Sequence, residues 1–393
     1  MNQQSRLPQG VIYTGVDDTD IDLFESQYDV PEGMSYNSYV ILDEKIAVTD
    51  TVDLRKADEW LTNVDKALKG KKPDYLIIHH MEPDHSGSIA KFIAKYPDTI
   101  VVGSAKALAM MSLYFEDTII NHKQEVKEGD NLALGKHNLT FIAAPMVHWP
   151  EVMLSFETTD GTLFAADAFG KFGAIQHETD DWACEARRYY FNICGKYGAP
   201  VQTLLKKASK LNIKTICPLH GPVLNSNLEY YINLYNIWSS YGVETPGVLV
   251  AYASIHGGTK AAALKLAEML EAKGCPKVAT ADLTRDDMEE AIEDAFRMDT
   301  TVLAASSYDA GVFPPMEDFL NRLQHKAFQN RRIALVENGS WAPSAARTMA
   351  KLLEPMKNIE LIPQTVTIKG RMHKEDIPNF EALAETIAAK YKN

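Results

Sequence analysis

Two different rhythms of hydrophobic residues divide the chain. From residue 1 to about 240, short apolar runs form hairpins that turn at Asp43-Glu44, Gly135-Lys136 and Asp160-Gly161. Between these hairpins, the strand-like runs YLIIH and TIVVG alternate with helical stretches such as ADEWLTNVDKALKG, which ends at Gly70. This first region is therefore expected to contain mixed sheets that are covered by helices.

A strict alternation of strands and helices begins at Pro246. The predicted strands are GVLVAYA, KVATADL, TTVLAAS, RRIALVE and IELIP. The predicted helices begin near Thr259, Asp286, Pro315 and Pro343, and a last one runs from about 376 to 392. This order is typical of a doubly wound parallel sheet. The turn-rich segment YGVETPG at 241–247 marks a boundary, so we predict one domain at 1–243 and another at 247–393.

The composition is that of a soluble globular protein. The 393 residues can bury two cores, and 46% of them are apolar while 24% are charged. The net charge of −13 argues against nucleic acid or an anionic membrane as the main partner, because both bind basic surfaces. The sequence has no signal-peptide pattern and no apolar run of the ~18 residues that a membrane span requires. We therefore expect a cytoplasmic protein.

The four cysteines do not form a metal-binding motif. None of them belongs to a C-x-x-C pair, so the sequence predicts no rubredoxin module, iron–sulfur cluster or zinc ribbon. We expect all four to be buried free thiols, namely Cys184, Cys194, Cys217 and Cys275.

Metal-ligand side chains are concentrated in the loop that follows YLIIH. His80, Glu82, Asp84 and His85 come after the C-terminal end of this strand, where α/β proteins build their sites, and Gly87-Ser88 opens the next helix. Two imidazoles and two carboxylates suit a transition metal better than calcium. A solvent-exposed polar loop is the alternative interpretation for any single member of this set.

Three more candidate ligands follow other predicted strands. His148 comes after FIAAP, Asp167 ends TLFAA, and His220 comes after KTICPL. Four histidines and three carboxylates suit two metal ions, each with three terminal ligands, and one bridging carboxylate. Trp149, His177 and Tyr197 are candidates for a substrate pocket near these metals, with ordinary packing or exposure as the alternative.

The pattern H-x-E-x-D-H at 80–85, together with His148, Asp167 and the CPLHG stretch at 217–221, resembles the flavodiiron proteins. Their first domain has the metallo-β-lactamase fold, an αββα sandwich. The hydrolases of that fold carry a histidine where Glu82 stands here, and a carboxylate shifts the metal preference from zinc toward iron. The resemblance implies two iron sites with a shared carboxylate. One iron would be held by His80, Glu82 and His148, the other by Asp84, His85 and His220, and Asp167 would bridge them.

The second region contains a candidate phosphate loop. SIHGGTK at 254–260 follows a strand and opens a helix, so its amides and hydroxyls can bind a phosphate, although a plain tight turn is the alternative. The loop resembles that of flavodoxins, with His256 where a third hydroxyl is usual. Because G-x-G-x-x-G is absent, we expect FMN and not a dinucleotide, with Asp282 as a weak ribose candidate.

The flavodoxin resemblance assigns two further loops, 306–316 and 337–345, to the isoalloxazine ring. The residues predicted to contact FMN are Ser254, His256, Gly257, Gly258, Thr259, Ser306, Ser307, Tyr308, Asp309, Ala310, Gly311, Asn338, Gly339, Ser340 and Trp341.

The family resemblance implies an oxidoreductase that reduces O2 to water, with NO reduction to N2O as a further activity. Two irons give one electron each and FMN gives two, which together match the four electrons that O2 requires. The resemblance also implies a separate donor, such as rubredoxin or a reduced deazaflavin, and a head-to-tail homodimer or a dimer of dimers. The rival interpretations are a dinuclear zinc hydrolase, which Glu82 opposes, and a plain flavin electron carrier, which the complete ligand set opposes.

Overall fold

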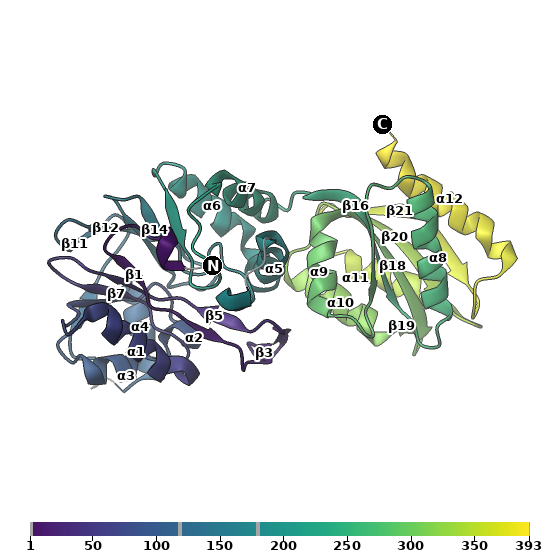
Figure 1. The fold of residues 1–393 in the computed structure, drawn as a ribbon. Helices are drawn as coiled ribbons and strands as arrows, with labels where there is room; N and C mark the ends of the chain where they lie inside the picture. The colour runs from purple at the N-terminus through teal and green to yellow at the C-terminus, as the bar shows by residue number, and fades with distance from the viewer. Residues whose placement is uncertain (1–2, 117–119, 178–180, 393) are drawn as a thin grey trace. The chain divides into compact units, whose positions relative to one another are not determined.

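The computed structural model describes residues 3–116, 120–177 and 181–392. The chain divides into two compact units (Figure 1). The first unit contains Met1–Ile193 and Ala199–Asn236, and the second contains Cys194–Gly198 and Ile237–Asn393. Within the described part of the chain, no helix has both the length and the apolar character needed to cross a membrane.

Two sheets form the centre of the first unit. The order of the six-stranded sheet is β1 (Val11–Tyr13), β6 (Tyr39–Ile41), β7 (Ala47–Thr49), β8 (Tyr75–Ile77), β9 (Ile100–Gly103) and β10 (Lys123–Glu125). The order of the five-stranded sheet is β11 (Asn131–Ala133), β12 (Asn138–Ala143), β13 (Met153–Glu157), β14 (Thr162–Phe164) and β15 (Thr215–Cys217).

Side chains of the first sheet are buried on both faces. Tyr39 and Ile41 belong to the apolar layer that also contains Phe141 and Phe164 of the second sheet, so this layer lies between the sheets. Val40, between them in sequence, packs in the other cluster with Trp60. Since successive strand residues point to opposite faces, the continuous apolar runs of the sequence reflect this double burial.

Helices cover the outer faces of the two sheets. The helices α1 (Ala57–Leu68) and α3 (Ile89–Lys95) bury Trp60 and Phe92 in the outer cluster of the first sheet. On the other sheet, α6 (Gly198–Ala208) reaches the end of β12, where Lys207 Nζ donates to the carbonyl of Ala143 at 2.8 Å. The unit is therefore an αββα sandwich, as predicted.

The three predicted hairpins are all present. Each joins antiparallel strands, and the turns lie inside the pairs Ile41 with Ala47, Ala133 with Asn138, and Glu157 with Thr162. One buried contact links their tips. Asp43 Oδ2 accepts hydrogen bonds from the backbone N–H of His137 at 2.6 Å and from its Nδ1 at 2.8 Å, and Asp160 Oδ2 lies 3.6 Å from His137 Nε2.

The second unit is a doubly wound sheet, which confirms the prediction. Its parallel strands lie in the order β17 (Val278–Asp282), β16 (Thr245–Ala253), β18 (Met298–Tyr308), β20 (Arg332–Asn338) and β21 (Glu360–Ile368). The short strand β19 (Gly311–Val312) pairs antiparallel with the end of β18.

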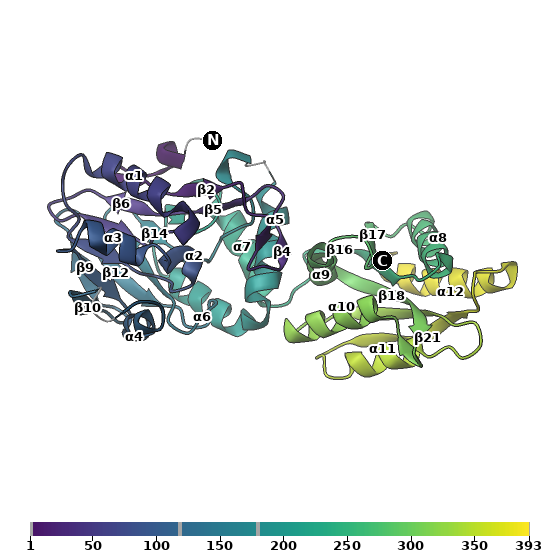
Figure 2. The same ribbon diagram turned by 90° about the horizontal axis from the view of Figure 1, so that it is seen from below.

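Helices lie on both faces of this sheet (Figure 2). One face carries α8 (Gly258–Ala272) and α12 (Ile377–Ala388), which share an apolar cluster with Val250 and Val302. The other carries α9 (Met288–Arg297), α10 (Pro314–His325) and α11 (Ala345–Leu353). The helix predicted from Asp286 begins two residues later, because the side chain of Asp287 caps it by accepting from the N–H of Glu289.

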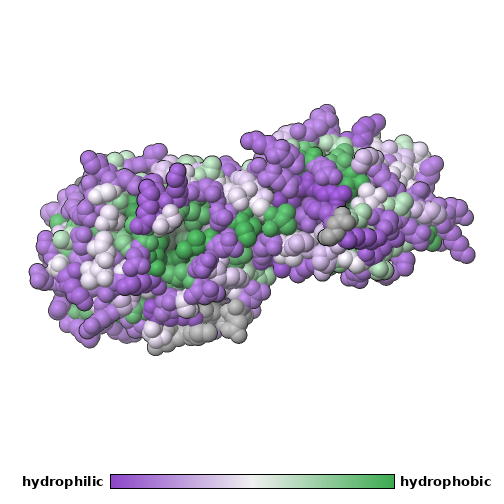
Figure 3. All heavy atoms as spheres, turned by 90° about the horizontal axis from the view of Figure 1, so that it is seen from above, coloured by the Kyte–Doolittle hydropathy of each residue, from purple (hydrophilic) through white to green (hydrophobic). Residues whose placement is uncertain are grey.

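One expectation about the cysteines is wrong. Cys194, Cys217 and Cys275 are buried as expected, but Cys184 is only partly buried, because it lies on the amphipathic helix α5 (Trp182–Tyr189). The face seen in Figure 3 is mostly hydrophilic, in keeping with the high net charge.

Replacing Asp43 by asparagine should lower the free energy of unfolding by about 1.5–3 kcal/mol at neutral pH, because the charged hydrogen-bond acceptor is lost. Although burial raises the pKa of Asp43, backbone N–H groups of His137, Lys136 and Glu44 outweigh it and lower this pKa from 3.8 to about 2. The stabilisation is thus present above the ordinary pKa and is lost as the pH falls toward 2.

Urea unfolding of the wild type and the Asp43→Asn variant at several pH values measures this effect. As a control, Asp58→Asn should change stability by less than about 0.5 kcal/mol, because this side chain is 87% exposed. An equal stability of the wild type and Asp43→Asn at pH 7 would contradict the prediction.

Candidate functional site

The seven predicted ligands lie in segments that follow β8, β12, β14 and β15. The structure adds one detail that the sequence interpretation missed, because the expected loop after His80 contains a single helical turn, α2 (Pro83–Ser86). Pro83 at the first helical position favours this start, and Glu82 precedes it. The turn separates Glu82 from Asp84 and His85, which join a different group of ligands.

The first group consists of His80, Glu82, His148 and Asp167, whose ligand atoms all lie within 4.8 Å of one another. The Nε2 atoms of His80 and His148 each lie 3.1 Å from Glu82 Oε2. They lie 3.4 and 3.1 Å, respectively, from Asp167 Oδ2. Four ligand atoms therefore converge on one point.

The second group consists of Asp84, His85 and His220. The Nε2 atoms of the two histidines lie 3.2 and 3.3 Å from Asp84 Oδ2. Asp167 takes part here with its other oxygen, because Oδ1 lies 3.1 Å from His85 Nε2 and 3.8 Å from His220 Nε2. One carboxylate thus presents one oxygen to each group, which is the arrangement of a bridging ligand.

The buried polar atoms of this cluster fit metal ions better than they fit one another. Asp84 Oδ2 and both oxygens of Asp167 are buried close to imidazole nitrogens, yet these atoms and Asp84 Oδ1 have no hydrogen bond of acceptable geometry among the described residues. Unsatisfied buried carboxylates are costly. A cation in each group would give these oxygens the partners that they lack.

Charges within the cluster shift several pKa values strongly. Burial lowers the pKa of His148, but the carboxylates of Asp167 and Glu82 outweigh it and raise this pKa to about 9. Burial raises the pKa of Asp84 to about 7. The carboxylates therefore hold protons on the neighbouring imidazoles, and a bound cation would replace these protons.

The support of the histidines could not be identified from the sequence. His80 Nδ1 lies 2.8 Å from Glu151 Oε1, and His220 Nδ1 lies 2.7 Å from the carbonyl oxygen of Ser35. Asn37 holds the loop of His220, because its amide donates to the carbonyls of Pro218 at 2.8 Å and Gly221 at 2.7 Å. The one sequence signal for the role of Glu151 was its position three residues after the predicted ligand His148, in the stretch HWPE.

His79, next to a predicted ligand, has a structural role. Its Nδ1 lies 2.6 Å from Asp50 Oδ2, and its Nε2 lies 2.8 Å from the hydroxyl of Ser155. Asp50 Oδ1 also accepts from the backbone N–H groups of His79 at 2.7 Å and His80 at 3.3 Å. This buried network fixes the backbone from which the ligands project.

The hairpin formed by β3 (Leu23–Phe24) and β4 (Tyr28–Asp29) borders the cluster. The rings of Phe24 and His220 have centroids 5.5 Å apart. At its tip, desolvation and the neighbouring charge of Glu82 raise the pKa of the surface residue Glu25 to about 7. This carboxyl group can therefore hold a proton next to a predicted ligand at neutral pH.

The three pocket candidates have different surroundings. The ring of Trp149 packs edge-on against His80, with centroids 5.2 Å apart and planes at 88°. His177 is exposed and lies 3.3 Å from Glu32, while Tyr197 contacts Lys196 in a segment that groups with the second unit. A role of His177 and Tyr197 in substrate access stays a prediction.

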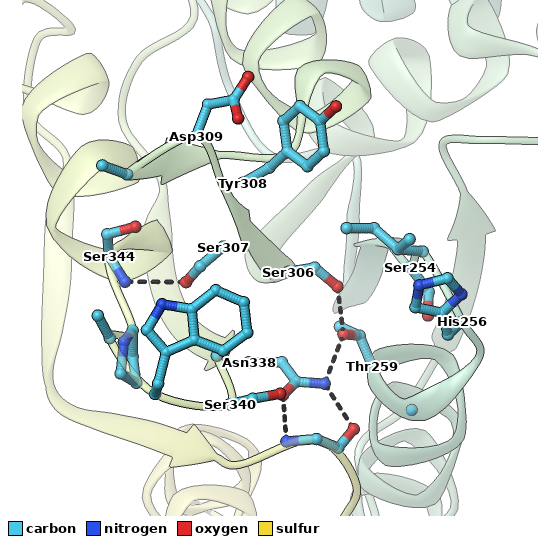
Figure 4. Close-up of a pocket in the computed structure, with 18 of the residues that line it drawn as sticks. Ser254, His256, Thr259, Ser306, Ser307, Tyr308, Asp309, Asn338, Ser340 and Ser344 are labelled. Atoms are coloured by element: carbon cyan, nitrogen blue, oxygen red, sulfur yellow. Dashed lines mark hydrogen bonds between the residues drawn. The ribbon is translucent and has the colours of Figure 1, made fainter.

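A cavity of about 690 Å³ lies at the C-terminal ends of β16, β18 and β20 in the second unit (Figure 4). All predicted FMN contacts line it except Gly257 and Gly311, which shape the adjoining turns. Trp341 borders the cavity with 91% of its surface exposed. Six lining residues were not among the named contacts: Ile255, Ala342, Pro343 and Ser344 lie within the predicted loops, whereas Arg347 and Gly370 lie outside them.

The phosphate loop has the geometry of an anion site at the start of α8. Gly257 has a φ of 86°, and its N–H donates to Ser254 Oγ at 3.1 Å. The hydroxyl of Thr259 lies 2.8 Å from that of Ser306 and accepts from the Asn338 amide at 3.1 Å, as Figure 4 shows. Free N–H groups at the N-terminus of a long helix favour a phosphate.

Asp282, the weak ribose candidate, makes side-chain contacts with neighbouring residues of its own unit. Its Oδ1 accepts from the hydroxyl of Thr284 at 2.6 Å, and its Oδ2 pairs with Lys260 at 3.1 Å.

A cluster of candidate metal ligands on an αββα sandwich, joined to a flavodoxin-like sheet with a candidate phosphate loop, is the combination expected of a two-domain redox protein. The family model described as "ODP family beta lactamase" matches residues 34–221. An uncharacterised protein of Methanocaldococcus jannaschii is 32% identical over 68% of each chain. A protein of Moorella thermoacetica named nitric oxide reductase is 28% identical over 99% of each chain.

Solved structures show the same fold. The rubredoxin oxygen:oxidoreductase from Desulfovibrio gigas has a TM-score of 0.90 at 24% identity, over 98% of each chain. The flavodiiron protein from Giardia intestinalis has a TM-score of 0.89 at 24% identity, over 100% of this chain and 98% of the other. The chain belongs to the flavodiiron protein family, which consists of oxidoreductases.

Replacing Gly258 by alanine should weaken binding of FMN by the second unit by about 5- to 150-fold. A Cβ at this position would overlap the carbonyl oxygen of Gly370, so the loop between β21 and α12 would have to move away from the phosphate site. Such overpacking costs about 1–3 kcal/mol. Quenching of flavin fluorescence on titration with FMN measures the affinity.

Gly311→Ala is the matched control, because the nearest atom to its Cβ would be Tyr308 O at an ordinary 3.5 Å. This variant should keep FMN affinity within a few-fold of wild type. Equal affinities of Gly258→Ala and wild type would show that the loop tolerates the side chain and that the geometric argument is wrong.

Proposed function

We propose that this chain is a flavodiiron oxidoreductase that reduces O2 to water and is chemically able to reduce NO to N2O. The observation that carries the proposal is the position of Asp167, whose two oxygens face the two ligand groups. The names of the Moorella and Desulfovibrio proteins, a nitric oxide reductase and an oxygen oxidoreductase, support the reaction class.

The residues of the first unit would hold two irons. His80, Glu82 and His148 would bind the first, Asp84, His85 and His220 would bind the second, and Asp167 would bridge them. When bound, the irons and FMN supply the electrons for reduction of the gas. Glu82 supports iron over zinc, because it adds a second carboxylate to the histidines of the first group.

The protein's own groups would prepare this chemistry. The Nδ1 atoms of His80 and His220 have fixed partners, so the two rings would present their Nε2 atoms to the metals. Glu25, whose pKa is raised beside Glu82, would be a proton donor at the edge of the cluster. Trp149 packs against His80 and so excludes water from that side of the cluster.

The second unit would bind FMN at the loop formed by Ser254, Gly258 and Thr259, with the ring between Tyr308 and Trp341. We assign the diiron domain to 1–243 and the FMN domain to 247–393. Because the sequence has no C-x-x-C pair, electrons would come from a separate donor such as rubredoxin or a reduced deazaflavin. We place the reaction in the cytoplasm.

We also propose a head-to-tail homodimer, from the family resemblance, in which the flavin of one chain serves the irons of its partner. A two-fold interface makes both such pairs at once. The same arrangement can repeat as a dimer of dimers.

The purified protein should contain about two irons and one FMN per chain, and its reduced form should consume O2. In His148→Ala, the iron content and O2 consumption should fall by tenfold or more, because loss of one ligand weakens the shared site. FMN should remain. Elemental analysis, flavin absorption and an oxygen electrode provide the three readouts.

His122→Ala is the control, because this exposed histidine lies in the same unit outside the ligand groups. Full iron occupancy in His148→Ala, or a wild-type protein that contains zinc and hydrolyses esters, would contradict the proposed function.

The dimer model predicts that two inactive variants complement each other. One variant carries His80→Ala and His148→Ala and keeps FMN, and the other carries bulky residues at Gly258 and Thr259 and keeps its irons. In the mixed dimer, the intact flavin of the first would face the intact irons of the second. O2 reduction should then return to about half of the wild-type rate per dimer.

A mixed dimer verified by native mass spectrometry that stays inactive would rule out electron transfer between chains. Mixing each variant with itself is the control, and neither sample should recover activity.

A further inference from the structure

In three ligand histidines, Nε2 faces the ligand group and Nδ1, the outer ring nitrogen, points away from it. These outer nitrogens have different partners. His80 Nδ1 lies 2.8 Å from a carboxylate oxygen of Glu151, whereas His220 Nδ1 lies 2.7 Å from the backbone carbonyl of Ser35. His85 Nδ1 is buried without a hydrogen-bond partner among the described residues. Of these three outer nitrogens, His80 Nδ1 is thus the one that meets a negative charge.

Glu151 is a buried glutamate in which one carboxylate oxygen makes the side-chain hydrogen bonds and the other makes none within the described chain. It is only 2% exposed, and one oxygen, Oε1, accepts both from His80 and from the backbone N–H of Met81 at 2.9 Å. Its other oxygen, Oε2, is buried without a hydrogen bond among the described residues. Burying a carboxylate is costly unless it is paired, so the His80 ring is the group that balances this charge.

A single short segment organises the first ligand group. His148 supplies one ligand, Trp149 packs edge-on against the His80 ring, and Glu151 holds the outer nitrogen of that ring. The segment is itself anchored, because the carbonyl oxygen of Glu151 accepts from the Ser104 hydroxyl at 2.9 Å. The second ligand group is held instead by the 35–37 segment, through backbone and amide contacts.

A hydrogen bond from Nδ1 to a carboxylate leaves the lone pair of Nε2 directed at the metal and makes the ring a stronger donor. A carbonyl partner fixes the same tautomer without a full negative charge. We propose that Glu151 is a positioning residue that orients His80 and gives the first metal position a higher affinity for divalent cations than the second. The inference rests on the proposed metal centre.

The Glu151→Gln variant separates the effect of the negative charge from the effect of the hydrogen bonds that orient His80. Its Oε1 can still accept from Met81 and from His80, while the negative charge is removed. Alanine removes the hydrogen bonds as well. In a titration of the metal-free full-length protein with Co²⁺, followed by visible absorption, the wild type should bind two equivalents with unequal affinities.

Glu151→Gln should weaken the tighter of the two sites by about 10- to 100-fold and leave the other unchanged. Glu151→Ala should weaken it at least as much. Double variants show which of the two metal positions Glu151→Gln affects. Glu151→Gln should add little to His148→Ala, which has already disrupted the first position, and should keep its full effect in His220→Ala, which disrupts the second.

Glu157→Gln is the matched control. Glu157 is an equally buried glutamate of the same unit, and its oxygens accept from the backbone N–H groups of Thr159 at 2.8 Å and Asp160 at 2.7 Å, which belong to the turn between β13 and β14 and not to a ligand segment. Its Co²⁺ affinities should stay within about threefold of wild type, with unchanged circular dichroism for all variants.

Wild-type Co²⁺ affinities in Glu151→Gln would overturn the inference, as would equal losses in Glu151→Gln and Glu157→Gln, which would indicate general destabilisation. Equal losses at both positions would overturn the claim of site preference. A wild-type protein that binds no pair of cations would instead refute the proposed metal centre, so the two failures are distinguishable.

Discussion

The burial of three carboxylates and four histidines at one point is the constraint on which the first unit depends. A carboxylate without a partner in a protein interior is strongly unfavourable, and Asp84 and Asp167 lack hydrogen bonds of acceptable geometry among the described residues. Two cations that share Asp167 would neutralise this cluster and hold four separate segments together. Metal binding at the proposed centre would therefore stabilise the sandwich.

The packing of two sheets explains how distant segments meet. The ligands of the 80–85 segment follow β8 of one sheet, whereas Asp167 and His220 follow β14 and β15 of the other. Both faces of the first sheet are buried, so its strands cannot slip by one residue without moving apolar side chains into the wrong layer. The register of the strands thus fixes where each ligand loop begins.

Much of the fold follows from local patterns. The hairpins at Asp43-Glu44, Gly135-Lys136 and Asp160-Gly161 have strong turn residues between alternating apolar runs, and the structure contains all three. The parallel sheet of the second unit was equally predictable from strict alternation. The helical turn at Pro83 was missed, because four residues are too few to show a periodicity.

The sequence by itself determined the two-domain organisation, the ligand types and the candidate phosphate loop, because these depend on residues that are close in the chain. The tertiary structure alone decided which oxygen of Asp167 faces which group, and that Glu151, Ser35 and Asp50 support the ligand segments. Contacts such as that between His220 and Ser35 join residues far apart in sequence. Their positions depend on how the sheets pack, which no local pattern encodes.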